Sequence, residues 1–340
     1  MKDNLVIINN EKCIKNNNEV FCENIEIKLL AEDLEKFYNL SFILRRSKVK
    51  PIHRIKGPKV SLSSNILFFL YEVISSIFKK NSKYLIISIT PYTFLSFLII
   101  LLFQKKTFLY LRSDGYKEVN FILGKKFLWA YKIMEIIMIK YSHLITVNSE
   151  ISRGKNYKLV NPSSIDQYWS ENLKEPDIDN CKLLYVGRLK VEKGVYSLIN
   201  IFKEYSAIEK NASLTLVGHG NFINNKIDNI KILPAISEKK ELIKVYDNHN
   251  IFILPSFTEG HPRVLIESLS RKRPIIIFGD IKHVKNNFKG VFVSKRDSES
   301  LAQTINHIFK NYKDIQKSME KNIYPTREKF IKQLIDILKN

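Results

Sequence analysis

The stretch Lys182–Phe202, KLLYVGRLKVEKGVYSLINIF, is typical of a strand, a loop and a helix in succession. Its apolar run ends at Gly187, and the polar loop that follows carries Arg188 and Lys193. A helical pattern of apolar residues begins at or just after Gly194. Because strand followed by helix is the repeating unit of parallel α/β sheets, this stretch predicts such a sheet in the second half of the chain.

The loop in this stretch is also a candidate anion site. Helix starts favour negative charge because their N–H groups are unpaired, and Arg188 and Lys193 would add charge-assisted hydrogen bonds. A second interpretation stays open, because a chain with 55 Lys and Arg among 340 residues places cations in most of its loops. Spacing alone does not decide between the two.

Short apolar runs alternate with helical patterns over nearly the whole chain. This predicts an α/β protein with two Rossmann-like doubly wound domains, whose ligands bind at the carboxyl ends of the strands and in the cleft between the domains. In the first half the expected strands are Leu5–Ile8, Ser41–Leu44, Tyr84–Ile89, Thr107–Leu111 and His143–Val147. In the second half they are Lys182–Val186, Ser213–Val217, Ile230–Leu233, Ile251–Leu254 and Pro274–Phe278.

A lapse in this pattern sets the expected domain boundaries. Residues 162–180 are rich in Pro, Ser, Asp and Asn and are predicted to be a linker. The N-terminal domain then covers 1–161 and the C-terminal domain 181–325, since one hydrophobic core rarely organises 340 residues. A last helix, 326–340, could pack back on the N-terminal domain.

Composition limits the class of protein. Hydrophobic residues make up 45% and charged residues 26% of the chain, as in folded soluble proteins. Three scattered cysteines and the lack of a signal-peptide pattern predict a cytoplasmic protein, without a disulfide framework or a zinc site. A net charge of +21 indicates an acidic partner, such as nucleic acid, an anionic membrane or a phosphate-bearing substrate. Heavy use of Lys throughout the chain is the alternative explanation, and it stays open.

One basic segment is denser than the rest. RRSKVKPIHRIKGPK, from Arg45 to Lys59, is broken by two prolines and is predicted to be a loop. Its cations are Arg45, Arg46, Lys48, Lys50, Arg54, Lys56 and Lys59.

Two apolar stretches raise the question of a membrane. Tyr84–Phe103 is 20 residues without a charge, a length that can span a bilayer, but Pro91 and several Ser and Thr divide it. We therefore predict a buried strand followed by a buried helix. The helix Asn65–Phe78 is apolar nearly all round, which predicts deep burial or contact with an apolar partner.

The stretch Leu254–Ser268, LPSFTEGHPRVLIES, places two glutamates eight positions apart. Each has an ordinary explanation when taken singly. Glu259 is a carboxylate near a helix N-terminus, and Glu267 could pair with Arg271 one helical turn later. These explanations do not account for the occurrence of both residues around one glycine- and proline-containing turn. The turn follows a strand, at the place where a doubly wound domain binds its ligands.

Three motifs in this order, GRLKVEKG, LVGHGN and LPSFTEGHPRVLIES, resemble the retaining glycosyltransferases of the GT-B fold, in the large group called family 4. The hallmark of that family is a Glu, seven residues and a second Glu, matched by Glu259 and Glu267. The resemblance is specific over about Lys182–Phe278, and TVNSE and NPSSID are similar to the family's domain junction. The first 140 residues match only in the order of strands and helices.

The resemblance implies a role for each of these positions. Arg188 and Lys193 would hold the diphosphate of a nucleotide-sugar, Glu267 its ribose, and Glu259 the transferred sugar. The leaving phosphate, and no protein carboxylate, would assist the acceptor hydroxyl, so that configuration is retained. No metal and no cofactor are expected. The implied donor-binding residues are Gly187, Gly218, Gly260, His261, Pro262, Arg263, Val264 and Glu267.

The chain departs from the family's pattern at a position that lies near the transferred sugar in the family. The family often carries a histidine after the fourth strand of its N-terminal domain, where this chain has Arg112, Ser113 and Asp114. Asp114 could act as a base or bind a sugar hydroxyl, or it could be an ordinary turn residue before Gly115. Both interpretations stay open.

The acceptor would enter from the N-terminal domain. The cations Arg45, Arg46, Lys48, Lys50 and Arg54 and the apolar helix Asn65–Phe78 would suit an acceptor on a lipid diphosphate, at an anionic membrane surface. The expected function is transfer of a sugar, from a UDP-sugar in our prediction, to a lipid-linked glycan of the bacterial surface. Alternatives are a non-catalytic membrane- or nucleic-acid-binding protein on the same scaffold, and an epimerase or phosphorylase of that fold. We expect no nucleic acid partner.

Overall fold

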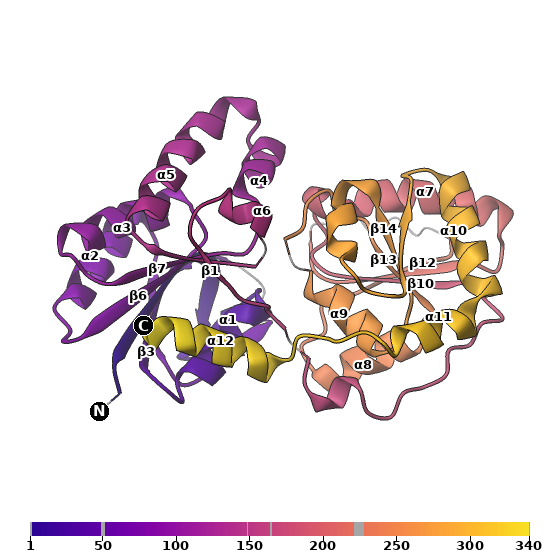
Figure 1. Ribbon diagram of the computed structural model, residues 1–340, viewed down its shortest axis with the longest axis horizontal. Coiled ribbons are helices and arrows are strands. Elements are labelled where there is room, and N and C mark those ends of the chain that lie inside the picture. The colour runs from indigo at the N-terminus through magenta and orange to yellow at the C-terminus, as the bar shows by residue number, and fades with distance from the viewer. Residues whose placement is uncertain are drawn as a thin grey trace. The chain divides into compact units, whose positions relative to one another are not determined.

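The computed structural model describes residues 2–48, 52–147, 149–163, 165–220, 228–260 and 262–339. The chain divides into an N-terminal unit, Met1–Asn161 with Glu328–Asn340, and a C-terminal unit, Pro162–Arg327. Each unit has its own hydrophobic core and its own sheet (Figure 1). The predicted α/β class with two doubly wound domains is confirmed.

The sheet of the N-terminal unit is built on parallel strands in the order β5-β3-β1-β6-β7-β8-β9. The central strands are buried on both faces and rich in Ile, Leu and Tyr, as expected for a sheet covered by helices on both sides. The strands are β1 (Asn4–Asn16), β3 (Asn39–Arg46), β5 (Lys59–Ser63), β6 (Ser82–Ile87), β7 (Thr107–Leu111), β8 (His143–Thr146) and β9 (Lys158–Leu159).

The basic segment from Arg45 to Lys59 is not a simple loop, and that prediction is corrected. Arg45 and Arg46 end β3, where they pair with the second half of β1. Two short strands, β2 (Glu19–Cys22) and β4 (His53–Ile55), extend the sheet with antiparallel ladders. Backbone pairing with the long β1 therefore organises polar sequence that carries no alternating apolar pattern.

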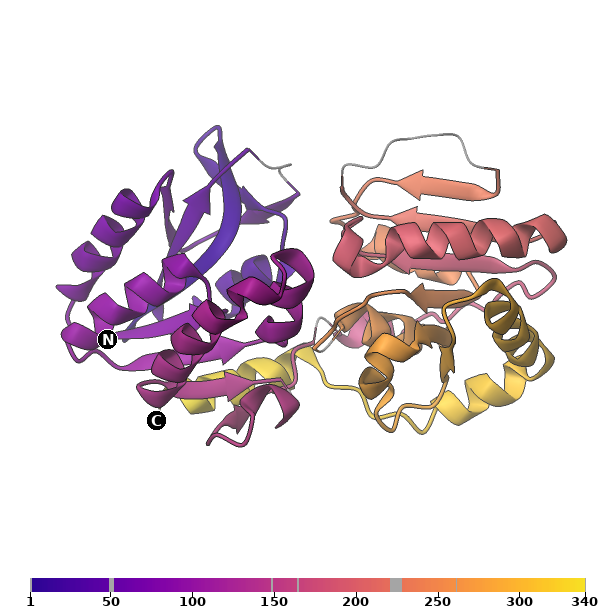
Figure 2. The same ribbon diagram turned by 90° about the horizontal axis from the view of Figure 1, so that it is seen from above.

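Helices cover both faces of this sheet. Figure 1 shows α2, α3 and α5 on one face and α1 with α12 on the other. Figure 2 shows α12, in yellow, against the N-terminal unit. There Lys83 Nζ donates to the carbonyl of Leu338 (3.0 Å), and Gln333 Oε1 accepts from the Asn161 N–H (3.1 Å). The helices are α1 (Ile25–Leu34), α2 (Ile66–Ile77), α3 (Pro91–Leu102), α4 (Gly115–Ile122), α5 (Leu128–Lys140), α6 (Ser149–Ser152) and α12 (Arg327–Lys339).

The uncharged stretch Tyr84–Phe103 is a buried strand followed by a helix, as predicted, but the helix is buried on one side only. β6 ends at Ile87, and α3 begins at Pro91 after Thr90, whose side chain accepts from the N–H of Thr93. Pro91 fits the first helical position because that N–H has no partner in a helix. In the part of the chain that the structure describes, no helix is long and apolar enough to cross a membrane.

The C-terminal unit has a sheet of parallel strands in the order β12-β11-β10-β13-β14-β15. The chain leaves β10 toward one edge and later returns to β13 on the other side of β10, so the order reverses between these two strands. In doubly wound sheets this reversal marks the ligand site. The strands are β10 (Lys182–Val186), β11 (Ser213–Val217), β12 (Ile230–Leu233), β13 (Ile251–Leu254), β14 (Ile275–Phe278) and β15 (Val291–Ser294).

The helices of this unit follow the predicted alternation, with two more after β15 that the sequence did not indicate. Figure 2 shows α7 lying along the parallel strands. The helices are α7 (Val195–Ile208), α8 (Lys239–Asp247), α9 (Arg263–Ser270), α10 (Ser298–Lys310) and α11 (Tyr312–Met319).

A buried arginine fastens the segment before β10 to the C-terminal unit. Arg271 directs all five of its N–H donors to Asp247 and to the carbonyls of Trp169, Glu171 and Asn172, at 2.7 to 3.1 Å. Its side chain and that of Asp247 are almost fully buried. Residues 162–180, expected to be a linker, are therefore packed against this unit.

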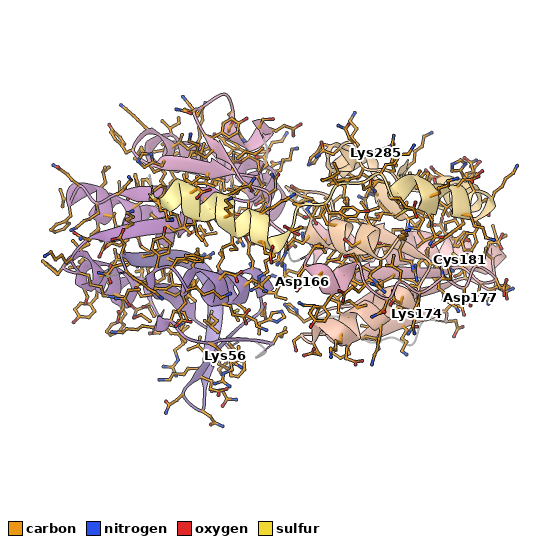
Figure 3. All side chains as sticks on the ribbon, turned by 60° about the horizontal axis from the view of Figure 1, so that its bottom comes forward. Lys56, Asp166, Lys174, Asp177, Cys181 and Lys285 are labelled. Atoms are coloured by element: carbon orange, nitrogen blue, oxygen red, sulfur yellow. The ribbon has the colours of Figure 1, made fainter. Side chains whose placement is uncertain are left out.

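A second buried arginine extends the same fastening. Arg273 donates to the carbonyls of Lys174 and Asp247, at 2.8 and 3.1 Å. Asn250 donates to the carbonyl of Asp177 (2.8 Å). Figure 3 labels Lys174 and Asp177 on this segment.

Two cysteines that are unrelated in sequence meet in the structure. Cys13 and Cys22 lie opposite each other in the β1–β2 ladder, and both are buried free thiols. Burial raises the pKa of Cys22 to about 12, so this thiol stays protonated at neutral pH and is a poor nucleophile.

Removal of Asp247 should destabilise the C-terminal unit strongly. Asp247→Ala leaves two buried guanidinium groups without their carboxylate, and we expect a loss of about 3–5 kcal/mol in the free energy of unfolding. Urea unfolding followed by tryptophan fluorescence and near-UV circular dichroism measures it.

The matched control lies in the same helix. Glu241 forms an exposed ion pair with Lys244 (2.7 Å), so Glu241→Ala should change the unfolding free energy by less than about 1 kcal/mol. Equal losses for the two variants would contradict the role of the buried cluster.

Candidate functional site

The loops that follow β10 and β13 lie side by side in the C-terminal unit. Their strands are neighbours in the sheet, so their carboxyl ends open at the same edge. The N–H of Phe257, in the second loop, donates to the carbonyl of Glu192 in the first (3.1 Å). The point of strand reversal is thus built from the two segments that the sequence singled out.

Lys193 and Glu259 form an ion pair across these loops. Lys193 Nζ lies 2.7 Å from Glu259 Oε1, and the Ser256 hydroxyl donates to the same oxygen at 2.7 Å. A ring nitrogen of His283 lies 2.8 Å from the backbone carbonyl of Glu259. Both charged side chains are partly buried, so the structure brings together two residues that are 66 positions apart.

Glycines make this close approach possible. Gly194 has a left-handed conformation (φ +67°), and a Cβ there would lie 1.9 Å from the carbonyl oxygen of Pro255. A Cβ on Gly218 would lie 1.8 Å from the carbonyl oxygen of Gly187. Close backbone contacts between loops therefore require a glycine at position 194 and at position 218.

Glu267 lies on α9 with its side chain directed to the core of the unit. It is 8% exposed, and the Tyr246 hydroxyl donates to its Oε2 (3.0 Å). Burial and the adjacent carboxylate raise the pKa of Tyr246 well above its ordinary value, so this hydroxyl remains a donor. An ion pair with Arg271, the ordinary explanation for Glu267, is not formed, because Arg271 directs all its side-chain donors to other residues.

The start of α9 offers donors to an anion. Pro262 is the N-cap residue of this helix, and no side chain caps the helix. Among the described residues, no hydrogen-bond partner meets the buried Nη1 of Arg263. The guanidinium of Arg263 and the N–H groups of the first turn of α9 therefore lie together at this point. His261 lies outside the described residues.

Arg188 stands at the end of β10. The Tyr185 hydroxyl donates to its carbonyl (2.8 Å), which fixes the backbone there. The Arg188 side chain is exposed, so its guanidinium is available to a ligand at this edge of the sheet.

Several residues of this site gave no signal in the sequence. Ser256, Tyr246 and His283 contact the predicted glutamates, and Arg296 donates to the carbonyl of Pro255 (3.0 Å). The guanidinium of Arg296 also packs over the ring of Phe257 (4.2 Å). Only the position of Ser256 directly before the Glu259 turn could have indicated its role.

In the N-terminal unit, Asp114 caps α4. Its carboxylate accepts from the N–H of Tyr116 (3.1 Å) and pairs with Arg153 (2.9 Å). At the end of the adjacent β7, Arg112 pairs with Glu26 of α1 (2.6 Å). Glu26 was not predicted from the sequence; the available signal was its place in the first turn of α1, after the capping Asn24.

The predicted acceptor cations have different surroundings. Arg45 donates to Asn10 (3.2 Å) and lies over the ring of Tyr92, and Arg54 pairs with Glu19 (2.6 Å). Arg46 and Lys48 are exposed, whereas Lys50 lies outside the described residues.

One Asp-x-Asp sequence occurs in the chain, at Asp177–Asp179, in the segment before β10. Asp177 pairs with Lys182 and accepts from the N–H of Asp179 (3.0 Å), as in a local turn. Within the ranges that the structure describes, no three His, Cys, Asp or Glu side chains are grouped to hold a metal ion.

Comparison with known sequences points to one family. Residues 180–311 match the family model of the glycosyl transferases group 1. The chain is 30% identical over 141 residues to the capsular polysaccharide biosynthesis glycosyltransferase CapM of Staphylococcus aureus, which covers 37% of this chain and 36% of CapM. It is 25% identical over 137 residues to the putative teichuronic acid biosynthesis glycosyltransferase TuaC of Bacillus subtilis, which covers 38% of this chain and 33% of TuaC. The matches span about a third of these relatives.

Two solved structures resemble nearly the whole chain. Sucrose-phosphate synthase from Thermosynechococcus elongatus has a TM-score of 0.70 at 15% identity, over 99% of this chain and 98% of that one. Anabaena HepE, solved in complex with UDP and glucose, has a TM-score of 0.70 at 12% identity, over 99% and 100%. At such identities the likeness establishes the fold alone, which is GT-B.

Gly194→Ala tests the contact between the two loops. The left-handed conformation costs a non-glycine residue about 1–2 kcal/mol, and the clash with Pro255 should add about 1–3 kcal/mol of destabilisation. Gly154 is the matched control, because it has a similar conformation (φ +75°) and nothing within 4 Å of a built Cβ. Chemical unfolding of both variants measures the difference, and equal losses would contradict the close approach.

Proposed function

We propose that this chain, which has the GT-B fold and matches the group 1 glycosyltransferase model over residues 180–311, transfers a sugar from a nucleotide-sugar to a glycan acceptor with retention of configuration. The observation that carries the proposal is the Lys193–Glu259 pair, assembled between β10 and β13 beside the uncapped start of α9. Cations, open amides and a sugar-binding carboxylate at one sheet edge suit a ligand with a diphosphate and a sugar.

Each part of the nucleotide-sugar has a proposed binding partner in the site. Arg188, Lys193 and the Nη1 of Arg263 neutralise the diphosphate, and the backbone N–H groups of Arg263 and Val264, in the first turn of α9, add hydrogen bonds to it. Glu267 accepts hydrogen bonds from the ribose. In this scheme Lys193 exchanges part of its contact with Glu259 for phosphate, and Glu259 turns to the sugar hydroxyls.

The reaction exchanges one bond at the anomeric carbon. Its bond to the diphosphate oxygen breaks while the acceptor oxygen bonds on the same face, and the acceptor proton passes to the leaving phosphate. Charge on that leaving group grows in the transition state, where fixed cations and amides act most strongly. In this scheme no protein nucleophile, metal or cofactor takes part.

The substrates are proposed from the relatives. HepE binds UDP and glucose, and CapM and TuaC are named for capsular polysaccharide and teichuronic acid biosynthesis. We therefore propose a UDP-sugar donor and an acceptor of the bacterial surface polysaccharide class, linked to a lipid carrier, at the inner face of the cytoplasmic membrane. Arg46 and Lys48 are the proposed contacts with its phosphates.

Binding of UDP should stabilise the protein through Glu267. A hundredfold excess of UDP over its Kd raises the free energy of unfolding by about 2.7 kcal/mol, measured by thermal shift. Glu267→Gln keeps an acceptor for Tyr246 but loses the charge, so we expect about tenfold or more weaker UDP binding.

Glu299→Gln is the matched control, on the exposed first turn of α10, and it should bind UDP as the wild type does. Turnover of a UDP-sugar should persist in EDTA. No thermal shift with any nucleotide would contradict the proposed function, and an undiminished shift in Glu267→Gln would contradict the ribose contact.

The Asp114→Asn substitution distinguishes two roles of Asp114, capping of α4 and participation in the reaction. Asn caps helices as well as Asp and has nearly the same volume, so the melting temperature should hold. We propose that the Asp114 carboxylate holds a sugar hydroxyl in position, so kcat should fall about a hundredfold or more. An unchanged kcat would restrict Asp114 to capping α4.

A further inference from the structure

Helices α2, α3 and α5 form one layer on a face of the N-terminal sheet (Figure 1). α3 packs against both α2 and α5, and the rings of Phe78 and Phe103 meet edge to face where α2 and α3 end (centroids 6.4 Å apart). The inner sides of the three helices are buried in the core through Phe69, Phe97 and Met138.

The outer sides of the same helices are apolar as well. Exposed residues recur at helical spacing along each of them, so each helix presents a stripe to solvent. Phe78 and Leu102, at the ends of α2 and α3, are 77% and 78% exposed. The stripes are Leu67, Tyr71, Ile74 and Phe78 on α2, Leu95, Leu98 and Leu102 on α3, and Trp129, Ile133 and Ile136 on α5.

Most of the large apolar side chains exposed in the described residues belong to this layer and the adjoining α4. An exposed patch that extends over three neighbouring helices marks an interaction surface, since soluble surfaces normally scatter such residues singly. The sequence predicted either deep burial or an apolar partner for the first of these helices, and the structure leaves one side of it without cover.

Charge identifies the partner. Pairs of consecutive lysines follow α2 and α3 and precede α5. The sequences of the three helices contain two acidic residues, Glu72 and Glu135, and Glu135 is buried, with its pKa raised by that burial. An apolar face with a cationic margin matches the acyl region and the anionic headgroups of a bilayer. The margin is formed by Lys79, Lys80, Lys105, Lys106, Lys125 and Lys126.

The aromatic residues agree with this partner. Trp129, Tyr71 and Tyr141 are exposed on or beside the face, and such side chains prefer the boundary between headgroups and acyl chains. A second copy of the chain would bring the like-charged margins together, which disfavours self-association through this face.

We propose that the outer face of α2, α3 and α5 docks on an anionic phospholipid bilayer. The earlier expectation placed the membrane contact on the cations from Arg45 to Arg54 together with the helix Asn65–Phe78; the proposed surface keeps that helix, as α2, and adds α3 and α5 in place of the cationic segment. Arg45 and Arg54 are engaged with Tyr92 and Glu19, and the apolar area lies on the helices instead. The inference relies on the proposed function only for its purpose, which is to hold the enzyme where a lipid-linked acceptor lies.

Tryptophan fluorescence is a direct test, since the chain has two tryptophans. Trp129 is 67% exposed on the face, and Trp169 is 2% exposed in the C-terminal unit. Vesicles of phosphatidylcholine with about 30% phosphatidylglycerol carry enough negative charge to attract basic proteins. Binding to them should shift the emission of Trp129 to the blue. Brominated acyl chains should quench it, and Trp129→Phe should remove both effects.

Two sets of variants separate apolar from ionic attraction in vesicle flotation. Leu67→Ser with Phe78→Ser should weaken binding about tenfold or more, because both side chains lose their burial in the bilayer. The matched control replaces two equally exposed residues of the C-terminal unit, Ile208→Ser with Ile323→Ser, and should bind as the wild type does.

Neutralising three lysines of the margin should lower affinity for anionic vesicles about fivefold per lysine, with little effect on the weaker binding to pure phosphatidylcholine. The set is Lys80→Gln, Lys125→Gln and Lys126→Gln, against Lys210→Gln, Lys313→Gln and Lys321→Gln as control.

Binding that is equal in all variants, or no flotation with anionic vesicles, would overturn the proposal. A blue shift that depends on protein concentration without vesicles would assign the face to self-association and overturn it too. UDP binding is measured separately: a thermal shift without vesicle binding refutes the docking surface alone, and the reverse result refutes the proposed function alone.

Discussion

The site depends on the position of β10 and β13 side by side in a parallel sheet. Because both strands end at the same edge, the loops after them meet, and Lys193 reaches Glu259 at 2.7 Å. The approach is so close that Gly194 has no room for a side chain against Pro255. The cationic loop, the glutamate turn and the start of α9 thus form one surface because of strand order, and a different order would separate them.

Much of this arrangement could be predicted from the sequence. Apolar runs located the central strands, and strand order in doubly wound sheets places the loops of Lys193 and Glu259 together. Side-chain contacts between residues that are far apart in the sequence could not be predicted, because no local sequence pattern indicates them. Tyr246 reaches Glu267 through core packing. Arg271 does not follow the expectation for residues one turn apart on a helix, because its donors go to the buried Asp247 and to backbone carbonyls, while Glu267 is paired with Tyr246.

The N-terminal unit was less predictable, for a related reason. β2 pairs with the extended β1, and β4 pairs with β2; both strands are short, so their sequences carry no alternation of apolar residues that would predict them. The apolar character of α2 was evident from the sequence. Which side of α2 is covered depends on the sheet beneath it, and a helix that is apolar all round gives no indication of that side. The structure leaves a broad apolar face exposed on α2, α3 and α5, which the sequence pattern alone could not locate.

The most direct test of the central claim is hydrogen–deuterium exchange of the full chain with and without a bound UDP-sugar. If the two loops form one donor site, peptides that cover 187–194 and 255–260 should become protected together, along with the start of α9. Binding without protection of these peptides, or protection confined to the N-terminal unit, would contradict the account.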